Sequence, residues 1–295
     1  MTEPGAGQIW RAPAKVNLGL RVGRRAAGSP YHPLDSLMVA LDLADELAVE
    51  PGPGEGLLLV VEGAAIPGPN LVERAWRWYR ELGGPATGLR VVLHKRIPVA
   101  AGLGGGSSDA AALLRGLAGG RTDAPWLDGS RAGPALGMDV PFFLSGRPAA
   151  RVGGFGERVA PAPGPPAAWG VLLARPALAV STARVFAAYD AAGLGPSASV
   201  DPVAAALATG RLPEALPNDL ESALYAAHPE LSGFRERLNA ALAATGLRYV
   251  LGLSGSGPTF VALVPEAPPG SAAAAVLEAA MAPVAPWFRL TRCGA

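Results

Sequence analysis

Three consecutive glycines at positions 104, 105 and 106 lie between a predicted strand at residues 89–93 and a predicted helix at residues 109–117. Glycine adopts backbone conformations closed to other residues and lets a ligand approach the main chain closely. The first N–H groups of a helix have no internal partners, so they suit a phosphate group. We therefore predict a phosphate-binding loop, formed by Pro98, Val99, Ala100, Ala101, Gly102, Leu103, Gly104, Gly105, Gly106, Ser107 and Ser108.

Two common nucleotide-binding motifs are excluded for this loop. No Gly-Lys-Ser/Thr follows the glycines, so it is not a Walker loop. Gly102 and Gly104 are followed by Ser107 where a dinucleotide-binding fingerprint requires a third glycine, which argues against a dinucleotide-dependent oxidoreductase. The alternative that stays open is a flexible loop with a capped helix after it.

Polar and apolar residues alternate between positions 15 and 22, which predicts a half-buried strand. Lys15 and Asn17 then share one face of this strand, about 7 Å apart along it. They could contact a polyanionic substrate or a nearby acid. The other interpretation is the solvated face of an edge strand.

Asp139 stands between a glycine and a run of apolar residues. Such a setting predicts a shielded carboxyl group, and phosphoryl transfer to an alcohol needs a group that orients the hydroxyl and accepts its proton. A carboxylate that only caps a turn is the competing interpretation.

Aromatic residues suggest a further, weaker feature. Tyr31, His32 and Phe186 could stack on a nucleobase, although ordinary half-buried aromatic residues fit the sequence as well. The segment GLSGSGPT at residues 252–259 predicts a tight turn between two strands that can approach the glycine-rich loop without an intruding side chain.

Strands and helices interleave on both sides of the proline-rich segment at residues 161–166, which predicts an α+β protein of two domains, at residues 1–165 and 166–295. Ser181 is the predicted N-cap of a helix at residues 182–191. The other predicted helices cover residues 70–82, 202–208, 219–227, 230–244 and 272–281, and the other strands cover residues 36–40, 57–61, 169–174, 249–253, 259–264 and 288–292.

Composition narrows the class of protein. The formal net charge of +1 gives no field that favours nucleic acid or an anionic membrane. A single cysteine, Cys293, excludes an internal disulfide, and the spacing of the three histidines argues against a His-based metal site. The N-terminus lacks the profile of a signal peptide and the apolar stretches are short, so we expect a cytoplasmic protein with a small-molecule partner, either monomer or homodimer.

Taken together and in order, the motifs resemble those of the galactokinase, homoserine kinase, mevalonate kinase and phosphomevalonate kinase (GHMP) superfamily. The matching segments are APAKVN at 12–17, PVAAGLGGGSS at 98–108 and SGSGPT at 254–259. Within it, the chain is similar to the family of 4-diphosphocytidyl-2-C-methyl-D-erythritol kinases, through YH at 31–32, L-x-SL at 34–37, ALDLAD at 40–45, NLV at 70–72, GMDVP at 137–141 and NDLE at 218–221.

The resemblance implies a first domain like ribosomal protein S5 domain 2, a second ferredoxin-like domain, and an active site in the cleft between them. It implies phosphorylation of the 2-hydroxyl of the cytidine diphosphate conjugate of methylerythritol by ATP with Mg²⁺, in non-mevalonate isoprenoid biosynthesis. The roles that it implies for single residues are catalytic base for Asp139 and its partner for Lys15, cytosine contacts for Tyr31, Phe186 and His32, substrate contacts for Asn17 and Thr182, and positions near the nucleotide for Lys95 and Asn70.

One departure from the family pattern lies before Tyr31, where Ser29 and Pro30 are inserted between Gly28 and the tyrosine. A second is the segment at 119–130, rich in Gly, Asp and Pro, to which no role is assigned; no Mg²⁺ ligand is assigned either. Two other functions stay open: a kinase or decarboxylase of the mevalonate branch acting on another small alcohol, and a nucleotide-binding regulatory protein without catalysis.

Overall fold

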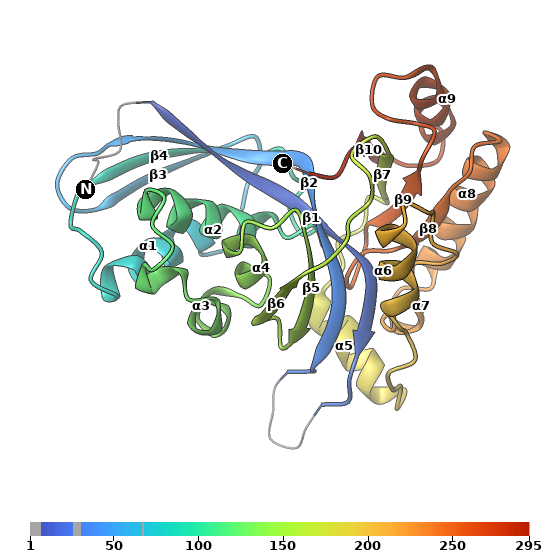
Figure 1. Ribbon diagram of the computed structural model, residues 1–295, viewed down its shortest axis with the longest axis horizontal. Helices are drawn as coiled ribbons and strands as arrows, with labels where there is room; N and C mark the ends of the chain where they lie inside the picture. The colour runs from blue at the N-terminus through green and yellow to red at the C-terminus, as the bar shows by residue number, and fades with distance from the viewer. Residues whose placement is uncertain (1–6, 26–30, 67, 295) are drawn as a thin grey trace.

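Two β-sheets form the framework of the computed structural model, which describes residues 7–25, 31–66 and 68–294 (Figure 1). The first sheet has the strand order β3-β4-β2-β5-β6, and β1 pairs with β2 along its other edge. These strands are β1 (Gln8–Val22), β2 (Leu34–Pro51), β3 (Leu57–Glu62), β4 (Leu89–His94), β5 (Ala149–Gly154) and β6 (Arg158–Pro161).

Four α-helices gather on one side of the long strands β1 and β2 (Figure 1). Together with a 3₁₀ turn they cover that face of the first sheet through a core that includes Leu47, Leu93, Leu113 and Phe142. The helical elements of this half are α1 (Leu71–Glu81), α2 (Gly105–Ala118), η1 (Pro125–Leu127), α3 (Gly129–Leu136) and α4 (Val140–Leu144).

The second sheet has the order β10-β7-β9-β8, with every neighbouring pair antiparallel. In chain order this is 4-1-3-2, the split β-α-β arrangement of the ferredoxin-like fold. Its strands are β7 (Gly170–Arg175), β8 (Val250–Leu253), β9 (Phe260–Val264) and β10 (Trp287–Thr291), and the helices of this half are α5 (Thr182–Ala191), α6 (Asp201–Ala208), α7 (Glu221–Ala227), α8 (Glu230–Ala244) and α9 (Ala272–Met281).

A shared core joins the two halves. On β7, Leu172 and Ala174 pack toward the helices of the second half, whereas Val171 and Leu173 pack against Leu18 and other residues of β1 and β2. A strand that is buried on both faces has no polar alternation, which explains the continuous apolar sequence of β7. The α+β prediction is confirmed, while the boundary between residues 165 and 166 and the likeness to ribosomal protein S5 domain 2 stay predictions.

Most predicted elements lie within two residues of the observed ones, and α5, α8 and α9 have the predicted bounds. Three predictions were too short. The strand predicted at residues 15–22 is the second part of β1, which begins at Gln8. The strand predicted at residues 36–40 is a fragment of the 18-residue β2, and α2 starts at Gly105 rather than at Asp109. Glycine has low helix propensity, so the first turn of α2 owes its shape to tertiary contacts that a local pattern does not contain.

Five elements were not predicted from the sequence: η1, α3, α4, β5 and β6. The segment at 119–130, to which no structure was assigned, contains η1 and the start of α3, and Trp126 buries its ring against the helical layer there. The Trp126 indole donates a hydrogen bond of 3.1 Å to the Leu114 carbonyl, which attaches this Gly/Pro-rich segment to α2.

Candidate active site

The glycine-rich loop lies between β4 and α2, as predicted, and lines a cavity of about 250 Å³. The walls are Ile66, Leu71, Lys95 and the chain from Pro98 to Ser107. Gly104 is the N-cap of α2 and has a left-handed backbone, φ 71°. The free N–H groups at the start of α2 therefore belong to the same loop that lines the cavity, an arrangement that suits an anion.

Two of the glycines are needed because other parts of the site approach them closely. A Cβ on Gly102 would lie 2.7 Å from the Gly257 carbonyl oxygen, and a Cβ on Gly104 would lie 3.0 Å from both the Lys15 Cγ and the Phe143 ring. Both residues also have positive φ, which L side chains adopt at a cost. The loop is thus in close contact with β1, with α4 and with the turn between β8 and β9.

The β8–β9 turn at residues 254–259 is the tight turn predicted from its glycines, and side chains attach it to the loop and to β1. The Thr259 hydroxyl donates to the Ala101 carbonyl at 2.6 Å, and the Ser254 hydroxyl accepts the Asn17 N–H at 3.1 Å. From the other side, the Asn218 amide donates to the carbonyls of Leu253 and Gly255 at 3.0 and 2.8 Å. These bonds fix the second half of the chain against the loop.

Lys15, Asn17 and Asp139 come together beside the loop. The Lys15 ammonium donates to the Asn17 Oδ1 at 2.8 Å and lies 3.5 Å from the Asp139 Oδ2. Lys15 is 5% exposed, whereas the side chain of Asp139 is 33% exposed, so the prediction of a shielded acid holds only in part. Asp139 is the first residue before α4, where its carboxylate remains accessible because it makes no cap hydrogen bond to the helix.

Register shifts in the β1–β2 pair bracket Lys15 and Asn17 and turn their side chains toward the site. The Asn17 amide is held at both ends, because its Nδ2 donates to Ser36 at 2.7 Å while its oxygen accepts from Lys15. The Ser36 hydroxyl in turn donates to the Gly19 carbonyl at 2.7 Å. These polar residues are buried, so the interpretation of a solvated edge-strand face is wrong.

His32, two residues before β2, lies in an aromatic cluster with two residues of α5. Its ring is 5.0 Å from that of Phe186 and 5.8 Å from that of Tyr189, and its Nε2 lies 2.8 Å from the Asp190 Oδ1. Tyr31 is half-exposed, and its ring is 6.3 Å from that of Phe155 in the β5–β6 turn. The structure thus brings His32 and Phe186 together, with Tyr31 next to His32 in the chain; a cytosine between Tyr31 and Phe186 stays a proposal. The inserted Ser29 and Pro30 lie outside the described residues.

The remaining predicted site residues make different contacts: these are Thr182, Asn70 and Lys95. The Thr182 hydroxyl is 2.8 Å from the Ser256 hydroxyl, which places the start of α5 next to the β8–β9 turn. Asn70 is the N-cap of α1 and accepts the Val72 N–H at 2.9 Å. The Lys95 ammonium lies under the loop, where it binds the carboxylates of Asp45 and, at 2.7 Å, Asp109.

Several residues of the site were not predicted from the sequence. Ser254 and Ser256 could have been found from the sequence only because they belong to the turn that was predicted to approach the loop. No sequence pattern indicates Asp190 or Ser36, which contact site residues distant from them in the chain. Asp45 lies inside the motif at residues 40–45 and Asp109 directly follows the glycine-rich loop, and no role was predicted for either residue. No local sequence pattern predicts that these two carboxylates contact the same ammonium group, that of Lys95.

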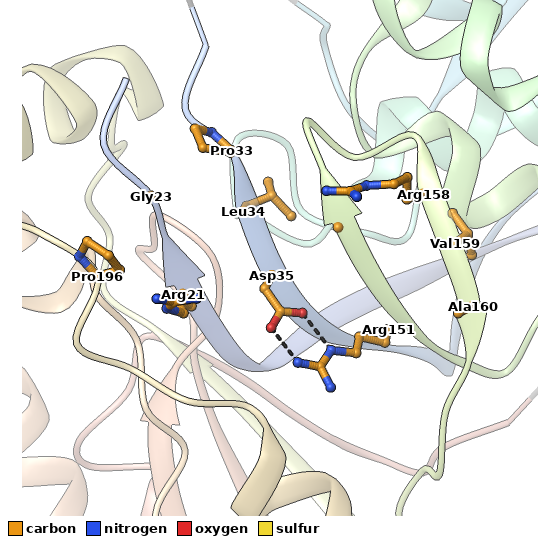
Figure 2. Close-up of a pocket in the computed structure, with 11 residues that line it drawn as sticks. Arg21, Gly23, Pro33, Leu34, Asp35, Arg151, Arg158, Val159, Ala160 and Pro196 are labelled. Carbon is orange, nitrogen blue, oxygen red and sulfur yellow. Dashed lines mark hydrogen bonds and ion pairs between the residues drawn. The ribbon is translucent and has the colours of Figure 1, made fainter. Parts of the chain in front are cut away.

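A larger cavity, of about 730 Å³, is lined by a different set of residues (Figure 2). Its lining includes Arg21, Arg158 and the bidentate pair of Arg151 with Asp35, which share one face of the first sheet. None of the residues that line it was predicted as a site residue. The smaller cavity at the loop is the one next to Lys15 and Asp139, so size alone does not locate the candidate active site.

Comparisons with known proteins identify the family of the chain. Residues 70–147 match the GHMP kinases N terminal domain. The chain is 42% identical over 257 residues to 4-diphosphocytidyl-2-C-methyl-D-erythritol kinase from Thermus thermophilus, covering 85% of this chain and 86% of that one. It is also 42% identical over 273 residues to the enzyme of the same name from Deinococcus radiodurans, covering 90% and 87%.

The chain belongs to the 4-diphosphocytidyl-2-C-methyl-D-erythritol kinase family. A crystal structure of a 4-(cytidine 5'-diphospho)-2C-methyl-D-erythritol kinase superposes with a TM-score of 0.77 at 36% identity, over 98% of this chain and all of that one. Homoserine kinase from Cytophaga hutchinsonii superposes with a TM-score of 0.63 at 19% identity, over 99% and 96%, which shows the shared fold alone. Family membership makes the chain a small-molecule kinase, and no helix in the described part of the chain is long and apolar enough to cross a membrane.

Proposed function

We propose that the protein transfers the γ-phosphoryl group of ATP to the 2-hydroxyl of 4-diphosphocytidyl-2-C-methyl-D-erythritol, giving the 2-phosphate and ADP in the non-mevalonate route to isoprenoid precursors. The observation that carries this proposal is the convergence of Lys15 and Asp139 on the glycine-rich loop, in a chain of this family. A cation, a carboxylate and a set of free N–H groups are what an in-line phosphoryl transfer to an alcohol requires.

In this mechanism the loop N–H groups hold the phosphates of ATP, and the Lys15 ammonium offsets the charge of the transferred group. Asp139 orients the 2-hydroxyl and accepts its proton as the new oxygen–phosphorus bond forms and the bond to the β-phosphate oxygen breaks. Because Lys15 is held by Asn17, its charge is already in place when the substrates arrive, and this preorganisation lowers the reorganisation cost of the reaction.

The cytidine end of the substrate fits the cluster around His32. Asp190 fixes the orientation of the imidazole, and Phe186 packs against one of its faces. Tyr31 offers a half-exposed ring for stacking on the base. Asn17 is hydrogen-bonded to Ser254 and Thr182 to Ser256, both in the β8–β9 turn, and in this proposal the diphosphate and the sugar alcohol bind beside these residues.

Mg²⁺ is part of the proposal. In the described ranges, no group of three or more His, Cys, Asp and Glu residues is placed to hold a metal ion. Mg²⁺ in phosphoryl-transfer enzymes keeps several waters and is bound by the phosphates of the substrate together with one or two carboxylates, so it needs no large cluster of protein ligands. The ion would enter with ATP, and it would neutralise charge on the β- and γ-phosphates.

A substrate panel tests the proposal. ADP release from ATP and Mg²⁺ is measured with 4-diphosphocytidyl-methylerythritol, mevalonate, homoserine and galactose. We expect release with the cytidyl substrate alone. ADP release with another alcohol instead would support kinase activity but contradict the proposed cytidine site. ATP binding without ADP release for any alcohol would favour a regulatory protein without catalysis.

A further inference from the structure

Three charged side chains meet directly beneath the glycine-rich loop: Asp45 from β2, Lys95 after β4, and Asp109 in α2. Their exposures are 0%, 4% and 1%. A Cβ on Gly105 would lie 3.3 Å from the Lys95 ammonium and 3.4 Å from the Asp45 Oδ2. The two carboxyl groups therefore lie behind the first turn of α2, while Lys95 also lines the loop cavity.

The charges of this triad do not balance when both carboxyl groups are ionised. One ammonium then faces two carboxylates, which leaves one uncompensated negative charge in a buried site. Such an excess charge is costly in a buried site, and one of two neighbouring carboxyl groups usually keeps its proton.

Hydrogen bonding decides which carboxyl group holds the proton. Asp45 accepts the N–H groups of Arg96 and Ile97 with its Oδ1 and the Lys95 ammonium with its Oδ2. Asp109 receives only the Lys95 ammonium, and its Oδ1 is buried without a hydrogen-bond partner. Hydrogen bonds stabilise the charged form of Asp45, and the unpartnered oxygen destabilises that of Asp109.

In the part of the chain that the structure describes, Lys95 and Asp45 are the charged groups that act on Asp109. The sheet side contributes Asp45 and Lys95, α1 turns an apolar face toward α2, and α4 packs on it with apolar residues. Lys15 of β1 lies on the far side of Gly104. Burial and the neighbouring Asp45 raise the pKa of Asp109 to about 7, against the lowering effect of Lys95.

We propose that nucleotide binding at the loop drives Asp109 fully into its protonated form, and that a proton from solvent is taken up by those molecules in which its carboxyl group was still ionised. The triad then becomes neutral, and the Lys95 charge is no longer shared by two carboxylates. This inference rests on the proposed function, because it requires the phosphates of a nucleotide in the cavity that Lys95 helps to line. Added negative charge near Asp109 favours its protonated form, which is why binding and proton uptake are linked.

The sign of the pH dependence follows from the same linkage. Asp109 has a higher pKa in the nucleotide complex than in the free protein, so affinity is greatest below the free pKa of about 7. It falls, by up to about tenfold per pH unit, as the pH rises from that value to the pKa of the complex. Above both pKa values no further loss occurs.

The test is calorimetric titration of the protein with ADP in buffers of different ionisation enthalpy, which counts the protons taken up on binding. Asp109→Asn keeps the size of the side chain and cannot titrate, and Asp123→Asn, at a carboxylate that is 78% exposed, is the matched control. Protons that ADP itself takes up on binding cancel when the proton uptake of Asp109→Asn is subtracted from that of the wild type. We expect greater proton uptake on ADP binding in the wild type and in Asp123→Asn than in Asp109→Asn. The ADP affinity of Asp109→Asn should also depend less on pH than that of the other two proteins.

ADP binding with equal proton uptake in all three proteins would overturn the inference and leave the proposed function intact. No ADP binding by the wild type would overturn the proposed function, and the inference with it. A ¹³C NMR titration of the Asp109 carboxyl in the wild type, with and without ADP, does not depend on the folding of a variant. It should show a higher pKa with ADP, and an unchanged pKa would contradict the inference.

Discussion

At the scale of single residues, Lys15 is a buried cation whose nearest partner is neutral. Its ammonium donates to the Asn17 oxygen, while the Asp139 carboxylate stands 3.5 Å away and remains partly exposed. A compact ammonium can thus serve a phosphoryl group without first breaking a tight ion pair, and the carboxylate stays accessible to a hydroxyl group. Lysine suits this task because its charge is concentrated at one point.

Asp139→Asn removes the proposed proton acceptor and keeps the shape of the side chain. We expect kcat to fall by about 10² or more with ADP affinity nearly unchanged, because general-base catalysis contributes on this scale and Asp139 does not line the loop cavity. Steady-state kinetics and ADP titration measure the two effects, with Asp123→Asn as the control. Activity within a few-fold of the wild type would exclude Asp139 as the base.

At the scale of elements, the loop keeps its shape through contacts with β1, α4 and the β8–β9 turn. Sequence patterns located the loop, the turn and the strand that carries Lys15, because glycine runs and alternation are local signals. They did not show that Gly102 touches Gly257 or that Thr259 binds the Ala101 carbonyl, since these contacts join residues more than 150 positions apart.

The same limit applies to the missed elements. β5 and β6 are short, and α4 has only five residues, so none of them offers a long periodic pattern. Lys95 was predicted near the nucleotide from its motif, and it does line the cavity. Its two buried carboxylate partners come from other elements, so their role depends on tertiary structure.

Gly102→Ala tests the contact between the loop and the turn. The added Cβ would lie 2.7 Å from the Gly257 oxygen, on a backbone with φ 74°. Gly246→Ala is the matched control, because φ is 70° there and no atom lies within 4 Å. We expect both to lose about 1–2 kcal/mol from left-handed strain, with a further loss and weaker ADP binding only for Gly102→Ala. Equal unfolding free energies and equal ADP affinities would show that the contact is unimportant.

At the scale of the whole molecule, the site exists only because the two sheets are held together. Asp219, just before α7, is one such link. Its Oδ2 accepts the Val22 N–H of β1 at 2.9 Å, and its Oδ1 accepts from the Ser197 N–H, the Ser197 hydroxyl and the Ala198 N–H. A buried carboxylate with four donors orders three chain segments at once.

Asp219→Ala should therefore destabilise the whole protein. Leaving buried N–H groups of β1 and of the 197–198 segment without partners costs about 1–3 kcal/mol for each unsatisfied group. The measurement is the free energy of unfolding in urea, with Asp123→Ala, at a carboxylate that is 78% exposed, as the control. A loss no larger than that of the control would mean that Asp219 does not hold the halves together.

The central claim, transfer of the γ-phosphoryl group to the 2-hydroxyl of the cytidyl substrate, is tested most directly by the product itself. The wild-type protein is incubated with ATP, Mg²⁺ and 4-diphosphocytidyl-methylerythritol, and the product is examined by ³¹P and ¹³C NMR. The account predicts a phosphate monoester coupled to C2 of the methylerythritol unit, formed in equal amount to ADP. A phosphate on another hydroxyl, or ADP formed without a phosphorylated cytidyl product, would contradict it.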